Sequence, residues 1–235
     1  MPHSRKFARL FADRRTRKLA IPALAVAALA SCSTVQPSIE TRYTRWLDAG
    51  HRAEAERYAA FLRGEGLESV VPPMPLSRSA RDWKRCERDE FAVPPESLQS
   101  NMLPTLRLVA RLRDEGILDP ARARSVYRDP ALNECAGGSP GSKHVQNQAI
   151  DFDLPDRPDN VTRLCAFWRE HGEALRMGLG FYSPTTIHVD TGGYRTWGTD
   201  YTRRTSLCLT AESPPPDAAP AAPAPNAQAT PAPAR

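Results

Sequence analysis

SKHVQNQAIDFD at residues 142–153 and TIHVD at residues 186–190 are the two stretches that decide the fold of this chain. Apolar and polar side chains alternate in residues 149–154, which is typical of a strand with one buried face. Residues 179–182 and 185–189 are two further strand candidates. Three short segments of this kind, close together in the chain, predict a small antiparallel sheet.

Three polar residues interrupt these apolar patterns. His144 precedes Asp151 by seven residues, and His188 lies in an otherwise apolar strand. Two imidazoles and one carboxylate form a tripod for zinc that leaves the fourth coordination position open to water. Zinc lowers the pKa of such a water to about 7 and polarises a carbonyl group. A single strand histidine is more often structural, so the three residues need the support of the surrounding sequence.

Helical spacing of apolar residues surrounds the predicted strands. One helical segment covers residues 38–64, with a break at Ala49-Gly50, and a second runs from 94 to 116, where Pro104 is expected to kink it. A third segment covers residues 159–177. The folded unit, about residues 38–210, is therefore predicted to be α+β, with a small antiparallel sheet flanked by helices and an N-terminal helical extension.

The charge of the chain is unevenly distributed. The 235 residues include 32 basic and 27 acidic side chains, and residues 1–31 contain seven of the basic ones and one acid. The remainder carries 25 basic and 26 acidic residues, so the sequence excludes an electrostatic nucleic-acid binder. Residues 211–235 are rich in Pro and Ala, cannot bury a core, and are expected to form a disordered tail.

Residues 1–31 have the order of an export signal, with basic residues before the apolar run 21–30. That run is about 15 Å long as a helix, half of the ~30 Å that a membrane span needs. Leu29-Ala30-Ser31-Cys32 is similar to the lipobox of bacterial lipoproteins, whose cysteine is acylated. We expect a lipid anchor at Cys32 and, from Ser33, a periplasm-facing place on the outer membrane. An ordinary signal peptide with an incidental cysteine is the alternative.

Export also accounts for the other cysteines, which number four. In an oxidising compartment an even set predicts two disulfides, and the sequence leaves the three pairings open. A tetra-thiolate zinc site is the rival interpretation, although no Cys-x-x-Cys spacing supports it. The four residues are Cys86, Cys135, Cys165 and Cys208.

A longer ordered pattern includes the three polar residues. It closely resembles the zinc D-alanyl-D-alanine peptidases, the bacterial peptidoglycan metallopeptidases that share their fold with the hedgehog signalling domain. The resemblance covers about residues 93–200. Its motifs are Tyr127-Arg128-Asp129-Pro130, Asn133, Gly137-Gly138, Ser142-x-His144, Ala149-x-Asp151-Phe152, Gly180-Phe181-Tyr182 and His188-Val189-Asp190-Thr191-Gly192.

The resemblance implies a role for each matching residue. It makes His144, Asp151 and His188 the ligands of Zn²⁺, and it places Arg128 and Ser142 where they hold the substrate. A guanidinium suits the carboxylate or carbonyl groups of a D-Ala-D-Ala stem. A surface ion pair with Asp129 or another neighbour is the alternative for Arg128.

Two departures from the family pattern stand out. Asn147 replaces the glycine that follows the first ligand by three residues, and Asn tolerates the left-handed backbone that this glycine adopts. Thr185 and Thr186 occupy the positions where relatives commonly carry the catalytic base. Asp190, two residues after His188, is then the favoured candidate base, and Asp153, two residues after Asp151, is the other carboxylate at such a position. Orientation of a ligand imidazole is an equally supported role for Asp190.

The predicted function is hydrolysis of D-Ala-containing bonds in peptidoglycan stem peptides by zinc-activated water, as a D,D-carboxypeptidase or D,D-endopeptidase. The alternative is a lipoprotein that keeps the peptidase fold and only binds murein or a partner. Trp197 follows the last ligand closely and is a candidate to line the cleft, with packing in the core or at its rim as the alternative. The predicted parts are a signal peptide at 1–31, a tether at 32–37, the helical extension with a proline-rich connector at 38–92, the D,D-peptidase-like domain at 93–210 and the tail at 211–235.

Overall fold

The computed structural model describes residues 36–210. The predicted signal peptide, Cys32, all but the last two residues of the tether, and the Pro/Ala-rich tail lie outside the described residues. Among residues 36–210, no helix combines the length and the apolar character that a membrane crossing requires.

Two helices with a bend between them open the described chain. The helix α1 (Ile39–Trp46) begins at Ser38, whose Oγ accepts a hydrogen bond from the Thr41 amide at 3.3 Å. A π-helical turn, Leu47–His51, joins it to α2 (Arg52–Gly64), and Gly50 within that turn has a φ of 120°. The predicted break at Ala49-Gly50 is confirmed.

The predicted helix of residues 94–116 consists of three pieces, α4 (Glu96–Gln99), a 3₁₀ turn (Ser100–Met102) and α5 (Leu103–Asp114). The irregularity therefore precedes Pro104 instead of lying at it. Pro104 occupies the first turn of α5, where a missing N–H costs no helical hydrogen bond.

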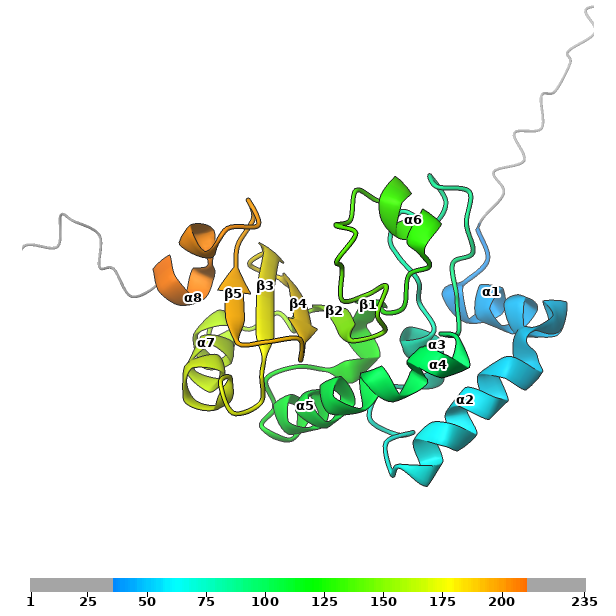
Figure 1. The fold of residues 1–235 in the computed structure, drawn as a ribbon, viewed down its shortest axis with the longest axis horizontal. Coiled ribbons are helices and arrows are strands. Elements are labelled where there is room, and N and C mark those ends of the chain that lie inside the picture. The colour runs from blue at the N-terminus through cyan, green and yellow to red at the C-terminus, as the bar shows by residue number, and fades with distance from the viewer. Residues whose placement is uncertain (1–35, 211–235) are drawn as a thin grey trace, which may run out of the picture. The chain divides into compact units, whose positions relative to one another are not determined.

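The sheet has five strands in the order β1-β2-β4-β3-β5, shown side by side in Figure 1. All neighbours are antiparallel except β3 and β5, which are parallel because β5 runs back from β4 on the far side of β3. The sequence did not indicate β5, which has three residues. The strands are β1 (Ala123–Ser125), β2 (Ala149–Asp153), β3 (Gly178–Ser183), β4 (Thr186–Asp190) and β5 (Arg195–Trp197).

The register of the strands aligns residues of the candidate metal site across the sheet. Asp151 on β2 pairs with His188 on β4, His188 pairs with Gly180 on β3, and Gly180 pairs with Trp197 on β5. Because side chains of paired residues point to the same face of a sheet, one row across this sheet carries Asp151, His188 and Trp197.

Four helices and two 3₁₀ turns complete the structure. The helix predicted for residues 159–177 ends at His171, because Met177 donates its amide to Gly172 O and so closes a turn before β3. The remaining elements are α3 (Pro73–Leu76), α6 (Pro130–Cys135), α7 (Asn160–His171), α8 (Leu207–Thr210) and the 3₁₀ turns Pro120–Arg122 and Arg203–Thr205.

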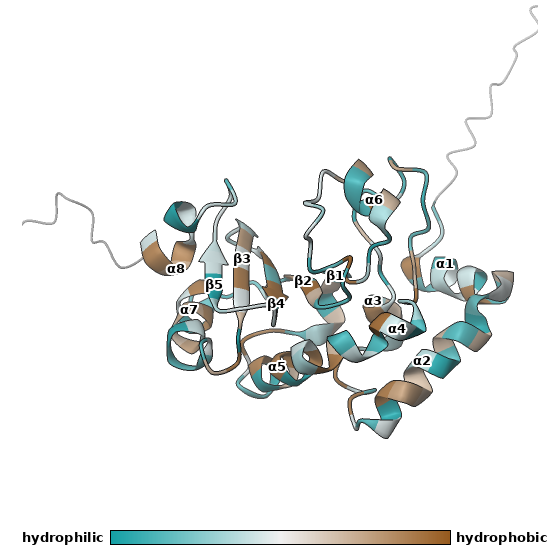
Figure 2. Cartoon of the chain, viewed as in Figure 1, coloured by the Kyte–Doolittle hydropathy of each residue, from teal (hydrophilic) through white to brown (hydrophobic). Residues whose placement is uncertain are grey.

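One core of buried apolar side chains extends from Tyr58 in α2 to Cys208 in α8. Leu106, Leu108, Val109 and Leu112 of α5 belong to it, and the apolar residues of α5, β3 and β4 appear as brown bands in Figure 2. The predicted domain boundary at residue 93 stays a prediction, and this core crosses it.

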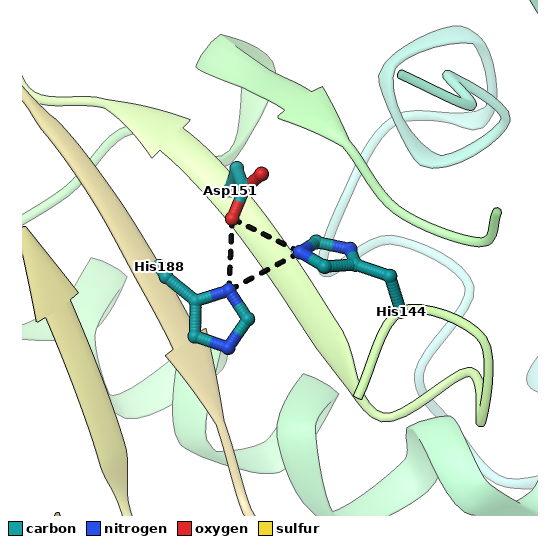
Figure 3. Close-up of side chains that lie close together, drawn as sticks. All are labelled: His144, Asp151 and His188. Atoms are coloured by element: carbon teal, nitrogen blue, oxygen red, sulfur yellow. Dashed lines mark hydrogen bonds and ion pairs between the residues drawn. The ribbon is translucent and has the colours of Figure 1, made fainter. Parts of the chain in front are cut away.

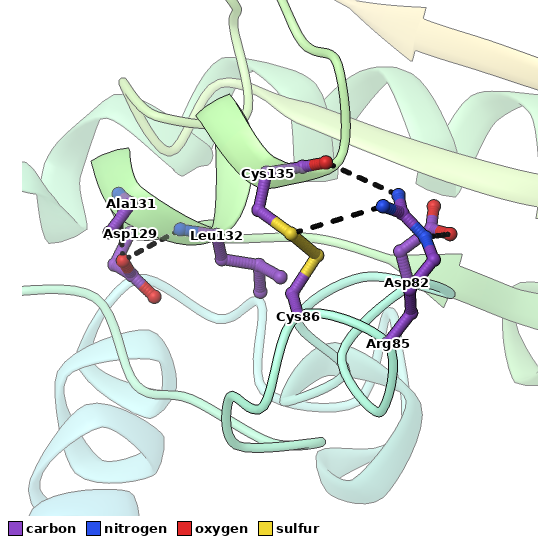
Figure 4. The surroundings of a disulfide bond; sticks show 7 residues. All are labelled: Asp82, Arg85, Cys86, Asp129, Ala131, Leu132 and Cys135. Atoms are coloured by element: carbon purple, nitrogen blue, oxygen red, sulfur yellow. Dashed lines mark hydrogen bonds and ion pairs between the residues drawn. A yellow bond between two sulfur atoms is a disulfide. The ribbon is translucent and has the colours of Figure 1, made fainter.

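Two disulfides resolve the three pairings that the sequence left open. Cys86 pairs with Cys135, and Cys165 pairs with Cys208. The first bond joins the loop before residue 90 to α6, where Arg85 also donates to the Cys135 carbonyl at 3.2 Å (Figure 4). The second attaches α8 to α7. The tetra-thiolate zinc site is therefore not formed.

Candidate metal centre

The structure brings His144, Asp151 and His188 together, as the sequence predicted. Their side chains point toward one another in Figure 3 and are all buried. His144 Nε2 lies 3.1 Å from Asp151 Oδ1, and His188 Nδ1 lies 2.9 Å from the same oxygen. The two imidazole nitrogens are 3.1 Å apart. Three donor atoms thus form a nearly equilateral triangle.

A tight turn before β2 places His144 over the sheet. Asn147 has a φ of 51° and donates its amide to the His144 carbonyl at 3.1 Å. Its side-chain Nδ2 donates to Leu98 O at 3.0 Å. The predicted tolerance of the turn for Asn is confirmed, and Asn adds an anchor to α4 that glycine lacks. Ser142 Oγ accepts from the His144 amide at 3.3 Å, so Ser142 also shapes this turn.

The partners behind each imidazole set its tautomer. His144 Nδ1 lies 2.6 Å from the Val126 carbonyl, which only accepts, so this nitrogen carries the proton. His188 Nε2 lies 3.0 Å from Asp190 Oδ2 and is protonated for the same reason. In the neutral rings, the inner nitrogens His144 Nε2 and His188 Nδ1 therefore present lone pairs to a carboxylate oxygen.

Three proton-free acceptors at this spacing repel one another unless a cation lies among them. Tetrahedral zinc with ligand bonds of about 2.0–2.1 Å separates its ligand atoms by about 3.3 Å, close to the spacing found here. An N,N,O donor set also suits zinc. His144, Asp151 and His188 therefore fit the metal that the sequence predicted.

The electrostatics of His144 and Asp151 favour this state, whereas those of His188 favour a proton that a metal ion would have to displace. Burial lowers the pKa of His144 to about 4 and keeps it neutral. Burial opposes ionisation of Asp151, but His144 and His188 outweigh it and lower the pKa of Asp151 well below its ordinary value. Burial also opposes charge on His188, yet its bonds to Asp151 and Asp190 raise its pKa. The site therefore holds a carboxylate between two imidazoles.

Arg128 lies against this group instead of forming a surface ion pair. Its Nη2 donates to Asp151 Oδ2 at 3.0 Å, and its Nε donates to Ser125 Oγ at 3.0 Å. Asp129, the alternative partner, instead caps α6 by accepting from the amides of Ala131 and Leu132. Arg128 thus fixes the carboxylate that faces the imidazoles, and its substrate role stays a prediction.

Asp190 is completely buried behind His188. Arg195 donates to both of its oxygens, at 3.0 and 2.6 Å, and the Gly192 amide donates to Oδ1 at 2.6 Å. Burial raises the pKa of Asp190, but His188 and Arg195 outweigh it and lower that pKa to about 2. Of its two predicted roles, this setting favours orientation of His188. Arg195 gave no signal in the sequence.

The group forms the floor of a cleft of about 650 Å³. Arg128, Ser142 and Trp197 line the cleft, as predicted, and the glycine-rich loop 137–141 forms part of its wall. Sequence reasoning missed Tyr182 and Tyr201, which also line it. Tyr182 stands inside a family motif, which was a usable signal, whereas Tyr201 had none.

Thr185 and Thr186 do not supply a proton acceptor. Thr186 lies on the same strand as His188 and donates its hydroxyl to Asp153 Oδ1 at 3.2 Å. Asp153 in turn pairs with Arg124 at 3.1 Å. The Thr185 hydroxyl bonds to Ser183 in the same hairpin, so both threonines support the strands instead of serving as a base.

Residues 82–190 match the family model described as Peptidase M15. Comparison with curated proteins and with solved structures gave no match. All three metal-binding candidates fall inside the matched segment, on the loop and strands that bring them together. Residues 82–190 therefore carry a peptidase M15 domain, which supports the predicted resemblance to the zinc D-Ala-D-Ala peptidases.

Proposed function

We propose that this zinc peptidase hydrolyses D-Ala-containing peptide bonds in peptidoglycan stems, as a D,D-carboxypeptidase or D,D-endopeptidase. The observation that carries the proposal is the convergence of two imidazole nitrogens and one carboxylate on the floor of an open cleft, with Arg128 beside them. Zinc held there supplies an activated water and polarises the scissile carbonyl.

The charges in the cleft suit an anionic peptide. Four basic side chains line it, and the two acidic ones are Asp82 and the metal-binding Asp151. Peptidoglycan stems carry several carboxylates, and a fork of guanidinium donors holds such a group in a fixed orientation. Arg128 lines the cleft and is itself held by Ser125 and Asp151, so binding a stem carboxylate costs it little side-chain entropy.

Tyr182 supplies a second donor beside the metal site. Its ring centroid lies 6.4 Å from that of His188, and burial together with the Asp151 charge raises its pKa strongly. The hydroxyl therefore keeps its proton at neutral pH and donates a hydrogen bond. Such a donor stabilises the negative charge that develops on the carbonyl oxygen during hydrolysis.

The proposal includes export and attachment to the membrane through a lipid on Cys32, with the domain facing the periplasm. Its support is the signal-like composition of residues 1–31 and the presence of two disulfides, which persist in oxidising compartments. Radiolabelled palmitate incorporation that disappears in Cys32→Ala tests the anchor. Equal labelling of the variant would contradict it.

The test of the activity uses the full mature chain, loaded with zinc and mixed with purified muropeptides, with products identified by mass. Loss of one alanine identifies a carboxypeptidase, and splitting of cross-linked dimers identifies an endopeptidase. His144→Ala is expected to abolish both zinc retention and turnover. His171→Ala is the matched control, because His171 lies on α7 and does not line the cleft.

The outcomes separate the enzyme from the binding protein. Zinc-dependent products that a chelator removes support the proposal. Intact muropeptides in the presence of bound zinc would overturn it and favour the lipoprotein that only binds murein. Full activity of His144→Ala would overturn the assignment of the metal site.

A further inference from the structure

One wall of the cleft is aromatic. We call the side chains of Tyr182, Trp197 and Tyr201 the aromatic wall. The Trp197 ring lies 5.1 Å from Tyr182 and 5.4 Å from Tyr201, centroid to centroid. It also lies 5.5 Å from the His188 ring, so the wall begins at the metal centre and extends outward.

The fold makes specific room for this wall. Gly180 on β3 pairs with Trp197 on β5, and a Cβ at Gly180 would overlap the indole ring. The absence of a side chain there lets the indole lie flat over β3 next to His188. Trp197 is only partly buried, so one part of the ring remains open to the cleft.

Tyr201 has an energetically unfavourable backbone conformation. Its side chain is 73% exposed and its φ is 60°, a left-handed conformation that is unfavourable for a bulky residue. Two backbone bonds fix the turn: the Tyr201 amide to Gly198 O at 2.8 Å, and the Gly198 amide to Thr202 O at 3.0 Å. Asp200 adds side-chain bonds from Thr202 and Thr205.

A strained and exposed aromatic ring gains little from folding alone. The segment that carries it is nevertheless rigidly attached, because α8 follows it and Cys208 is bonded to Cys165 in the core. A ring presented in this way at the mouth of a cleft is suited to contact a ligand. Its flat face offers π density and apolar area, with the hydroxyl at the edge.

The chemistry of the aromatic wall matches a sugar better than a peptide. A pyranose ring has a face of C–H groups that packs against an aromatic ring, and hydroxyls at its rim that reach polar edges. Extended peptide backbone needs rows of donors and acceptors, which the three rings do not provide. The charged residues of the cleft, suited to stem carboxylates, lie outside this wall.

The distances agree with this reading. Four residues and a lactyl link separate the scissile D-Ala bond from the sugar in a peptidoglycan stem, and the four residues alone span up to about 14 Å when extended. Two ring-to-ring steps, of 5.5 and 5.4 Å, lead from His188 through Trp197 to Tyr201. A stem bound at the metal centre can therefore bring its own sugar to the outer end of the aromatic wall.

We propose that the aromatic wall is a subsite for a hexosamine ring of the glycan strand, so that stems still attached to sugar are the preferred substrates. This inference rests on the proposed function. It adds a preference for a sugar on the substrate, which the metal centre alone does not impose.

The test compares one stem peptide in two forms, carrying its disaccharide and released from it, with the full mature zinc-loaded chain. The wild type is expected to show a KM about fivefold lower for the sugar-bearing form. Tyr201→Gly suits the left-handed backbone and removes the ring, so it should fold and lose that KM preference. Tyr201→Phe keeps the ring and should keep the preference.

Tyr194→Ala is the matched control, because Tyr194 is 41% exposed but stacks on Trp168 and does not line the cleft. It should leave both KM values unchanged. Equal KM values for the two substrates, unaffected by Tyr201→Gly, would overturn the sugar subsite while leaving the peptidase intact. A KM that rises equally for both forms in Tyr201→Gly would show that the ring contacts peptide, which also overturns it.

A separate binding measurement distinguishes failure of the subsite from failure of the proposed function. If neither substrate is cleaved, the proposed function fails, and calorimetric titration of the peptide-free disaccharide still decides the inference. Binding by the wild type that weakens in Tyr201→Gly and persists in Tyr201→Phe supports the subsite. No binding by the wild type would overturn it.

Discussion

Asp190 lies directly behind His188, with its Oδ2 3.0 Å from His188 Nε2. Arg195 holds the same carboxylate through two donors, and none of the Asp190 side chain is exposed. A buried carboxylate of this kind fixes the tautomer and the orientation of a ligand imidazole. The chain Arg195–Asp190–His188 therefore prepares the inner nitrogen of His188 for a metal.

Asp190→Ala is expected to weaken zinc binding about 10- to 100-fold, because His188 loses its orienting partner. It should also destabilise the fold, since Arg195 is left beside an unfilled buried site. Competition with a chromophoric chelator measures the affinity, and Asp153→Asn is the control on the neighbouring strand. Unchanged zinc affinity in a folded Asp190→Ala protein would contradict the positioning role.

Asn147 allows the backbone requirement to be separated from the side-chain bond. Asn147→Gly and Asn147→Ala both remove the donor to Leu98 O, but only Ala resists a φ of 51°. We expect the free energy of unfolding of Asn147→Ala to be about 1–2 kcal/mol below that of Asn147→Gly. Urea titration of the two variants provides the comparison. Equal free energies of unfolding would show that the left-handed backbone at residue 147 costs Ala no stability.

Each disulfide holds a different side of the cleft. Cys86–Cys135 joins the loop containing Arg81 and Asp82 to the start of the glycine-rich loop, and both segments line the cleft. Cys165–Cys208 instead anchors α8, which follows the segment of Tyr201.

Replacing Cys86 and Cys135 together by Ala should lower the free energy of unfolding by about 4 kcal/mol, because the bond closes a loop with a sequence separation of 49. The KM for stem peptides should rise as that wall loosens. The double replacement of Cys165 and Cys208, with a separation of 43, serves as the comparison of similar loop length. A stability loss below about 1 kcal/mol in the first variant would show that the loop is already fixed by other contacts.

Local patterns in the sequence were sufficient for the long elements and the metal-binding group. Apolar spacing predicted α1, α2, α5 and the strands β2, β3 and β4, because these bury one face against a single core. His144, Asp151 and His188 could be predicted because polar residues inside apolar strands are conspicuous and because their order matched a family pattern.

What the sequence could not provide depends on contacts between distant segments. The three-residue strand β5 has too few positions to show a period, and its partner β3 lies 17 residues earlier, at Gly178 for Arg195. The disulfide pairing is likewise a property of the folded chain. Arg195 and Tyr201 entered the site only through β5 and the turn after it, so no local signal marked them.

The turn that presents Tyr201 depends on a single carboxylate. Asp200 accepts hydrogen bonds from the Thr205 hydroxyl, from the Thr202 hydroxyl at 2.7 Å and from the Thr202 amide at 2.9 Å. These bonds, with the Thr205 hydroxyl contributing most, lower the pKa of Asp200 from 3.8 to about 2. A carboxyl group whose pKa is lowered by folding stabilises the fold above its unfolded pKa and loses that effect as pH falls through its folded pKa.

We therefore expect the turn to hold Tyr201 at neutral pH and to release it as pH falls from about 4 toward 2. Carbon-13 NMR of the Asp200 carboxyl should titrate with a midpoint near 2, and the Tyr201 ring signals should follow the same midpoint. Thr205→Val removes the strongest donor and should raise the midpoint toward the ordinary 3.8. A wild-type midpoint near 3.8 would mean that the carboxylate does not hold the turn, and the geometry of the aromatic wall would then need another support.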